Sequence, residues 1–338
     1  MMRIDYIAKN NKTGKLIYMK RILVTGAYGQ IGTELVNELR KRYGSENVIA
    51  TDIRDNPPKL IASNGPNKVL NIMDKEAIDN IVDEYNIDSI FHMAALLSAT
   101  GEKDPFLCWD INMNGTINII KTTIEKKLEK IFVPSSIAVW GPGVETINTP
   151  QESVLQPTTM YGVTKVSGEI LSDYFVKKHG LDIRGLRYPG IISSETLPGG
   201  GTTDYAVEIF YEAVKNKNYD CFLKEDATLP MMFMPDCIKA TIDLMEADFS
   251  RLKHHSNFNV AATSFSPAEL AEEIKKHIPD FEITYTPDSR QKIAESWPQV
   301  IDDSSAREEW DWSHEYDLEK MTKRMVEVLT EKHKNGLI

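Results

Sequence analysis

The sequence of 338 residues contains only three cysteines, Cys108, Cys221 and Cys237, and they lie far apart. No pair of them has the spacing of zinc ligands, and a disulfide framework needs a denser, even-numbered set. Among the seven histidines only His254 and His255 are close, and adjacent side chains point in different directions. We therefore expect a protein of a reducing compartment, with neither disulfides nor a bound metal.

Long hydrophobic runs and an excess of basic residues are also missing. No apolar run approaches the roughly 20 residues of a membrane-spanning helix, and there is no internal repeat or low-complexity tract. Lys and Arg number 39 against 50 Asp and Glu, a formal charge of −11, whereas nucleic-acid binding needs clustered basic side chains. We expect a soluble globular protein with neither a membrane nor a nucleic acid as partner. At about 150 residues per domain, the length suits two modest domains or one large unit with an appendage.

The first 18 residues differ in composition from the rest of the chain. They are polar and lack the apolar core of a secretory signal. They carry four basic residues and one acidic residue, which leaves a mitochondrial presequence open. Because Met19, Lys20 and Arg21 directly precede the first apolar run, we favour Met19 as the natural start and place residues 1–18 outside the fold. The expected location is cytoplasmic, or the mitochondrial matrix if the source is eukaryotic.

Short apolar runs alternate with helical patterns from residue 21 to residue 188. The runs predict strands, and the segments between them repeat apolar residues at helical spacing. The predicted strands are 22–24, 48–50, 89–91, 131–133 and 182–186, and the helices between them include 106–126 and 160–178. This alternation predicts an α/β fold of the Rossmann type, a doubly wound parallel sheet with helices on both faces. Ligands of such a sheet bind at the carboxyl ends of its strands, where the strand order reverses.

The second half of the chain has a less regular pattern. After a glycine-rich loop at 198–201, which we expect to be flexible, the pattern predicts helices near 204–215, 236–246, 267–277 and 318–331 and strands near 229–233 and 281–285. We predict a Rossmann domain of residues 19–188, to which residues 232–262 return. Residues 189–231 and 263–338 then form a smaller C-terminal α/β part that closes over this domain.

A glycine motif, Gly26-Ala27-Tyr28-Gly29-Gln30-Ile31-Gly32, follows the first predicted strand and opens a helix. Although its spacing is GxxGxxG, its glycines allow a tight turn and a close approach of the backbone to a pyrophosphate, and the helix N-terminus offers free amides. Asp52 lies twenty residues after Gly32, at the end of the second strand, where a carboxylate can bind ribose hydroxyls. This acid favours NAD over NADP, although the basic Arg54 argues in the other direction.

Tyr161 and Lys165 lie four residues apart at the start of the helix 160–178, so their side chains share one face. A free phenol has a pKa of roughly 10, too high for a base at neutral pH, and a nearby ammonium lowers it. Such pairs are common on solvated helix faces, but the dinucleotide fold favours catalysis here. Ser136 follows the strand 131–133, where its hydroxyl can hold a reacting oxygen against the phenol, although serines also simply end strands.

Together these residues resemble the extended short-chain dehydrogenase/reductase family. The likeness runs from residue 20 onward and includes His92-Met93-Ala94-Ala95, Asn112 and Gly115. It implies NAD as cofactor, Tyr161 as the acid/base, Lys165 as the residue that binds the nicotinamide ribose and tunes the tyrosine, and Ser136 as the residue that orients the substrate. The cofactor residues that it implies are Gly26, Gly29, Gln30, Ile31, Gly32, Asp52, Ile53, Arg54, Asn71, Ile72, Met93, Ala94, Ala95, Asn112, Tyr161, Lys165, Tyr188 and Ile191. Members of the family are commonly homodimers that pair the helices 106–126 and 160–178.

Stretches in the second half narrow this resemblance. Nucleotide-sugar epimerases and dehydratases usually carry an Asn where this chain has Gly190. The stretches 198–206, 229–236 and 296–298 are instead similar to the short-chain type of L-threonine 3-dehydrogenase, which implies metal-free oxidation of the L-threonine 3-hydroxyl to 2-amino-3-ketobutyrate. The substrate residues that this likeness implies are Ser98, Ser136, Tyr161, Gly201, Thr202, Thr203, Asp204 and Trp297. For Trp297 a plain place in the core is an equally good interpretation.

Two alternatives stay open. One is an NAD-dependent nucleotide-sugar epimerase or dehydratase on the same scaffold, which would keep its NAD bound through turnover. The other is a non-catalytic NAD-binding protein, against which the complete set of Tyr161, Lys165 and Ser136 argues.

Overall fold

The computed structural model describes residues 19–197, 199 and 201–338. The predicted extension 1–18 lies outside the described residues, as do Pro198 and Gly200 of the glycine-rich loop.

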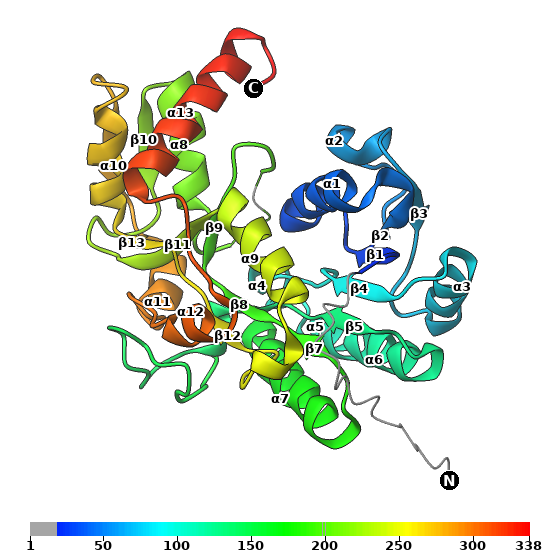
Figure 1. Ribbon diagram of the computed structural model, residues 1–338. Coiled ribbons are helices and arrows are strands. Elements are labelled where there is room, and N and C mark those ends of the chain that lie inside the picture. Colours follow the sequence, from blue (N-terminus) through cyan, green and yellow to red (C-terminus); the bar gives the residue numbers. More distant parts are fainter. Residues whose placement is uncertain (1–18, 198, 200) are drawn as a thin grey trace.

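Six parallel strands form the main sheet, in the order β3-β2-β1-β4-β5-β7 (Figure 1). They are β1 (Ile22–Thr25), β2 (Val48–Asp52), β3 (Asn67–Val69), β4 (Ser89–His92), β5 (Lys130–Phe132) and β7 (Ile183–Arg184). The chain starts in the middle of the sheet, winds outward to β3 and returns to β4 on the other side. The reversal between β1 and β4 opens a crevice at their carboxyl ends. The predicted doubly wound Rossmann sheet is confirmed.

Helices cover both faces of this sheet. They are α1 (Gln30–Tyr43), η1 (Ser45–Asn47), α2 (Lys59–Ala62), α3 (Lys75–Tyr85), α4 (Ser98–Gly101), α5 (Pro105–Trp109), η2 (Asp110–Asn114), α6 (Gly115–Lys126), α7 (Met160–His179) and α9 (Met234–Glu246). Ile22 and Val24 of β1 pack with α1 and α9, whereas Leu23 packs on the opposite face with α3, α6 and α7. The central strand β1 is fully buried, and its residues Ile22, Leu23 and Val24 are all apolar because neither face of it meets water.

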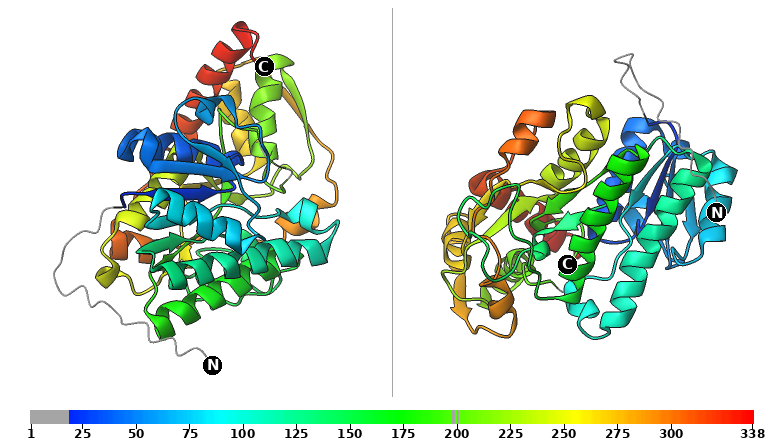
Figure 2. Two further views of the ribbon diagram at one scale, coloured as in Figure 1. Left: turned by 90° about the vertical axis from the view of Figure 1, so that its right-hand side faces the viewer. Right: turned by 90° about the horizontal axis from the view of Figure 1, so that it is seen from below.

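Two long helices carry the polar residues of the predicted site. The π-helical turn η2 joins α5 to α6, and α7 packs beside α5 and η2 (Figure 2). The hydroxyl of Thr159 accepts a hydrogen bond from the amide of Gly162 at 3.1 Å, and Gly180 ends α7 in the left-handed conformation. The N-terminal cap fixes the first turn of α7, where Tyr161 lies, and Lys165 follows one turn later.

The rest of the chain builds a second part with its own core, on the left in Figure 1. Its strands, and those that connect it to the main sheet, are β6 (Ser135–Ser136), β8 (Leu186–Tyr188), β9 (Gly190–Ile192), β10 (Asn218–Cys221), β11 (Leu229–Phe233), β12 (Phe258–Asn259), β13 (Thr263–Phe265) and β14 (Glu282–Tyr285). The helices of the second part are η3 (Ile137–Val139), α8 (Tyr205–Lys215), α10 (Pro267–Lys275), α11 (Arg290–Ala294) and α13 (Leu318–Lys334). Two further helices, η4 (Phe249–Arg251) and α12 (Ser304–Trp310), pack on the Rossmann core. Among the described residues, no helix is both long and apolar enough to cross a membrane.

The prediction of one strand over 182–186 is wrong. β7 ends at Arg184, and β8 begins at Leu186 in a different sheet, where it pairs with β6 and β12. Gly185 lies at the crossing, and a Cβ there would come within 2.2 Å of the carbonyl oxygen of Val133. The change of sheet places Tyr188 directly opposite Ser136 in the β6–β8 pair.

Candidate active site

A cleft of about 240 Å³ opens where the carboxyl ends of β1 and β4 meet β6, β8 and the loop before α8. The predicted site residues that line it are Gly26, Gly29, Gln30, Ile31, Gly32, Met93, Ala95, Ser98, Ser136, Tyr161, Lys165, Tyr188, Ile191, Gly201, Thr202, Thr203, Asp204 and Trp297. The predicted cofactor residues outside this lining are Asp52, Ile53, Arg54, Asn71, Ile72, Ala94 and Asn112. Sequence reasoning missed the lining residues Leu97, Pro134, Ser135, Ile137, Ala138, Pro189 and Gly199. All of these are close in sequence to residues that it did name.

The glycine motif forms a cradle without side chains. Gly26 has a φ of +64°, and a Cβ there would lie 2.5 Å from the amide nitrogen of Ala94. A Cβ at Gly32 would lie 2.4 Å from the carbonyl oxygen of Gly26. Gly29 is the N-cap of α1, so no cap side chain occupies the amides of the first turn. Such a helix N-terminus binds phosphate groups well, and the cradle fits a dinucleotide.

Asp52 ends β2 beside this cradle as a buried carboxylate. Its Oδ2 accepts a hydrogen bond from the amide of Tyr28 at 3.0 Å, and its Oδ1 lies 2.9 Å from Nε of Arg54. Burial alone would raise the pKa of Asp52, but the hydrogen bonds from Arg54 and Tyr28 outweigh burial and lower it. The carboxylate is therefore ionised at neutral pH. Arg54 and Ile53 are mostly exposed next to it.

Asn112 holds the segment after β4 in place. Its side-chain oxygen accepts from the amide of Leu96 at 2.8 Å, and its amide group donates to the carbonyl of Leu96 and to the hydroxyl of Thr164. The side chain thus links the π-turn to the cleft wall, and its direct contact with a cofactor stays a prediction. Two further predicted cofactor residues outside the lining differ in exposure: Asn71 is exposed and Ile72 is buried. Their contact with a cofactor also stays a prediction.

Tyr161 and Lys165 extend into the cleft from one face of α7. Nζ of Lys165 lies 5.3 Å from the centre of the Tyr161 ring and donates to the carbonyl of Pro134 at 2.8 Å. Burial lowers the pKa of Lys165 to about 8. Burial raises the pKa of Tyr161 to about 12, and a hydrogen bond with Ser136 partly offsets this effect. At neutral pH the unliganded cleft therefore contains a neutral phenol next to an ammonium.

The two serines of β6 have different partners. Ser136 lines the cleft, and its Oγ accepts a hydrogen bond from the amide of Ala138 at 3.2 Å. Ser135 Oγ instead donates to Oε1 of Glu169 at 2.5 Å, and Glu169 also forms a buried ion pair with Arg187 at 2.8 Å. Glu169 follows Lys165 by one helical turn, so the same spacing that identified Tyr161 could have pointed to it.

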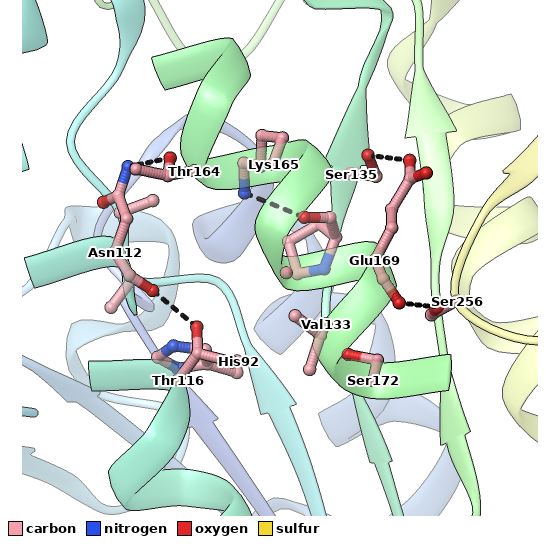
Figure 3. A pocket seen from close by; sticks show the side chains of 14 residues that line it. His92, Asn112, Thr116, Val133, Ser135, Thr164, Lys165, Glu169, Ser172 and Ser256 are labelled. Atoms are coloured by element: carbon pink, nitrogen blue, oxygen red, sulfur yellow. Dashed lines mark hydrogen bonds between the residues drawn. The ribbon is translucent and has the colours of Figure 1, made fainter. Parts of the chain in front are cut away.

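A small polar cavity of about 20 Å³ adjoins the main cleft and shares Lys165, Pro134 and Ser135 with its lining (Figure 3). His92, Glu169 and Ser172 line it together with Lys165. Among the described residues, Nε2 of His92 and Oγ of Ser172 have no hydrogen-bond partner. The cavity has room for about one water molecule. Sequence reasoning did not foresee this cavity, because its walls come from five segments that are far apart in the sequence.

The opposite wall of the cleft comes from the second part of the molecule. Gly201 donates its amide to Oδ2 of Asp204 at 2.5 Å, which closes the turn before α8. Trp297 both lines the cleft and packs into the core of the second part, so both sequence interpretations describe its position. Ser98 begins α4 at the cleft wall formed after β4.

The cysteines and the paired histidines have structural surroundings. Cys108, Cys221 and Cys237 are buried free thiols. His254 Nδ1 lies 2.6 Å from Oε1 of Glu309, whereas His255 stacks on a phenylalanine ring. Within the described residues no group of three His, Cys, Asp or Glu side chains could hold a metal ion.

The sequence pattern of the NAD dependent epimerase/dehydratase family matches residues 22–261. The chain belongs to this family. It is therefore an enzyme of an NAD-dependent family. An uncharacterized epimerase/dehydratase of Staphylococcus saprophyticus is 47% identical over 317 residues, 94% of this chain and 99% of the relative.

Solved structures show how similar the fold is to that of dehydrogenases. The L-threonine dehydrogenase of Clostridium difficile superposes with a TM-score of 0.91 at 50% identity, over 94% of this chain and 99% of the other. A monomeric L-threonine 3-dehydrogenase from a metagenome superposes with a TM-score of 0.88 at 48% identity, over 92% and 99% of the two chains.

Proposed function

We propose that this protein oxidises the 3-hydroxyl of L-threonine to 2-amino-3-ketobutyrate with NAD. One observation carries the proposal: a single cleft joins the glycine cradle, the group of Tyr161, Lys165 and Ser136, and the loop 201–204. The similarity to solved L-threonine dehydrogenases, at about half of all positions and over nearly the whole chain, supports threonine as the substrate.

The cofactor would lie with its pyrophosphate at the N-terminus of α1 and its adenosine ribose near Asp52. When bound, NAD supplies the hydride acceptor and a positive charge on the nicotinamide ring. Tyr161, as phenolate, takes the proton of the substrate hydroxyl while a hydride leaves the β-carbon, so the substrate loses two electrons and two hydrogens. The ammonium of Lys165 favours the phenolate, and Ser136 hydrogen-bonds the reacting oxygen. The loop 201–204 and Ser98 hold the amino-acid head group, with Trp297 at its side.

Two observations weigh against the alternatives. A Cβ at Gly190 would lie 2.3 Å from Sδ of Met231 and 2.8 Å from Cβ of Thr203, so the asparagine usual in nucleotide-sugar enzymes does not fit at this position without repacking. A protein that only binds NAD has no need of the contact between Lys165 and the Tyr161 ring, or of the hydrogen bond between Tyr161 and Ser136.

The test is NADH formation, followed by near-ultraviolet absorbance, on mixing the protein with NAD and L-threonine. We expect Tyr161→Phe to lower kcat by about 100-fold or more, because it removes the acid/base. Tyr85→Phe, on α3 outside the cleft, is the matched control and should keep full activity. If the wild type binds NAD but forms no NADH, threonine is not the substrate, and uridine diphosphate sugars are tested next.

A further inference from the structure

A carboxylate outside the group of Tyr161, Lys165 and Ser136 ties the cofactor helix to the substrate side of the cleft. Glu34 lies in the second turn of α1, just after the glycine cradle. Its Oε1 accepts hydrogen bonds from Oγ of Ser193 at 2.5 Å and from Oγ1 of Thr196 at 3.0 Å. The Thr196 hydroxyl also lies 3.3 Å from the carbonyl oxygen of Gln30, at the start of the same helix. Glu34 and Ser193 are 159 residues apart in the sequence.

The segment 193–196 is held from its other side as well. Nζ of Lys332, on α13, donates to the carbonyl of Ser194 at 2.6 Å and pairs with Glu195 at 2.7 Å. Within the segment, Ser193 Oγ accepts from the amides of Glu195 and Thr196. The segment is therefore fixed between a helix of the Rossmann part and the last helix of the second part.

This segment connects β9 to the loop that forms the substrate wall. The described residues of that loop, Gly199 and 201–204, line the cleft opposite Gly29 and Gln30. Burial raises the pKa of Glu34, and its two hydroxyl partners counteract this effect. Glu34 is half-buried, and removing a carboxylate even partly from water is unfavourable compared with doing so for an apolar side chain of similar size. The two hydrogen bonds that Glu34 accepts fix the distance between α1 and the segment.

We propose that Glu34 is a positioning residue that keeps the substrate wall in register with the cofactor helix. Threonine binding, rather than the hydride transfer itself, then depends on Glu34. This inference rests on the proposed function for its kinetic part and on the geometry alone for its structural part.

The kinetic test compares Glu34→Gln with Glu38→Gln. Both lie on α1, and Glu38 pairs at the surface with Arg42. Gln keeps the size of Glu34 and an oxygen that can accept, but it removes the charge that strengthens both hydroxyl hydrogen bonds. We expect kcat/KM for threonine to fall about tenfold, mostly through KM, while the dissociation constant of NAD changes less than about twofold. Glu38→Gln should match the wild type in both.

Thr196→Val gives an independent check of the same contact. It removes one donor and leaves Glu34 in place, so its effect should have the same KM-dominated form. Both changes weaken the same interaction between Glu34 and Thr196. We therefore expect the kcat/KM of the double variant Glu34→Gln/Thr196→Val to equal that of the less active single variant. If the fold-loss in kcat/KM of the double variant equals the product of the two single losses, the two residues act separately and the proposal is overturned.

Hydrogen exchange of the amides of 202–204 provides a readout that does not need a substrate. We expect faster exchange in Glu34→Gln than in the wild type and in Glu38→Gln, with unchanged exchange in β1. If the wild type fails to oxidise threonine but this difference is present, the proposed function fails and the positioning role stands. Unchanged exchange at 202–204, or a loss confined to kcat or to NAD binding, overturns the positioning role.

Discussion

At the scale of single residues, burial shifts the pKa values of the two titratable side chains that share the cleft. Tyr161 and Lys165 lie side by side, yet burial moves the pKa of Tyr161 up to about 12 and that of Lys165 down to about 8. Both shifts favour the neutral forms, so the unliganded cleft disfavours the phenolate that the proposed reaction requires. A positive charge brought by an oxidised nicotinamide ring would act in the opposite direction. Under the proposed function, the phenolate of Tyr161 would therefore form more readily with the cofactor bound than in the empty cleft.

The buried side chain of His92 should make the unfolding free energy depend on pH in the acid range. Burial and the charge of Lys165 lower the pKa of His92 from 6.5 to about 3. The unfolded chain therefore binds more protons than the folded one between these values. The neutral ring's contribution to stability is complete above pH 6.5 and is lost as the pH falls toward 3. This one group accounts for at most about 1.4 kcal/mol of unfolding free energy per pH unit.

We expect His92→Gln to weaken this dependence on pH. Gln can keep a hydrogen bond to Thr25, whose hydroxyl lies 2.8 Å from Nδ1 of His92, but it does not titrate. Urea unfolding at several pH values between about 4 and 7 should show a shallower slope for His92→Gln than for the wild type. His333→Gln, exposed on α13, is the control. Equal slopes for wild type and His92→Gln would contradict the lowered pKa.

At the scale of secondary structure, local signals predicted some elements well. The helix expected over 160–178 is α7, with Thr159 and Gly180 as its caps. The apolar run at 229–233 is β11 with the same bounds. The elements that were missed depend on partners far along the chain. β12 consists of two residues and pairs with β8, from which it is separated by about seventy residues, so its own sequence has too few residues to show a period.

The first turn of α7 permits a test with two glycines of one helix. A Cβ at Gly162 would lie 2.2 Å from the carbonyl oxygen of Ala138, whereas a Cβ at Gly168 would meet no atom within 4 Å. We expect Gly162→Ala to cost about 1–3 kcal/mol of unfolding free energy. This turn carries Tyr161, so the kcat of Gly162→Ala should also fall. We expect a loss of about 100-fold if Tyr161 is displaced by roughly 1 Å.

Gly168→Ala is the matched control for this change. It should alter the unfolding free energy by less than about 1 kcal/mol, in the stabilising direction, since alanine is the better helix former. Thermal unfolding and NADH formation measure both variants. Similar losses in the two would mean that the contact with Ala138 does not position the helix.

At the scale of the whole molecule, the candidate site belongs to both parts of the chain. On the Rossmann side, the glycine motif, Ser136 and Tyr161 could be predicted to line one cleft because each lies at a strand end or in the first turn of a helix. The loop 201–204 and Trp297 came only from family resemblance. The contact between Glu34 and Ser193 could not be predicted at all, since nothing in either local sequence indicates a partner across the cleft.

The surface of the predicted homodimer would include exposed apolar side chains on α5 and α7. Phe106 on α5 is 83% exposed, and Ile170 and Tyr174 on α7 are 64% and 51% exposed, so these helices present apolar side chains to solvent. We propose that a second copy of the chain covers them. Sedimentation should find a dimer for the wild type and a monomer for Ile170→Glu, because a buried unpaired charge is costly at an interface.

Leu337→Glu is the control for the dimer, since Leu337 is 68% exposed but lies at the end of the chain. It should leave the dimer intact. A related solved dehydrogenase is described as monomeric, so the fold does not by itself require a partner. A monomeric wild type would overturn the dimer and leave Phe106 and Ile170 as ordinary surface residues.

The three free cysteines have a consequence for following how this molecule opens. Cys108 lies on α5 behind the cleft, Cys237 on α9 against the Rossmann core, and Cys221 on β10 in the core of the second part, and each is fully buried. An alkylating reagent reaches a buried thiol only during a local opening of the structure around it. The labelling rates of the three peptides therefore report three separate opening equilibria from the unmodified chain. Comparing these labelling rates with and without NAD would show around which cysteine the cofactor makes local opening less frequent.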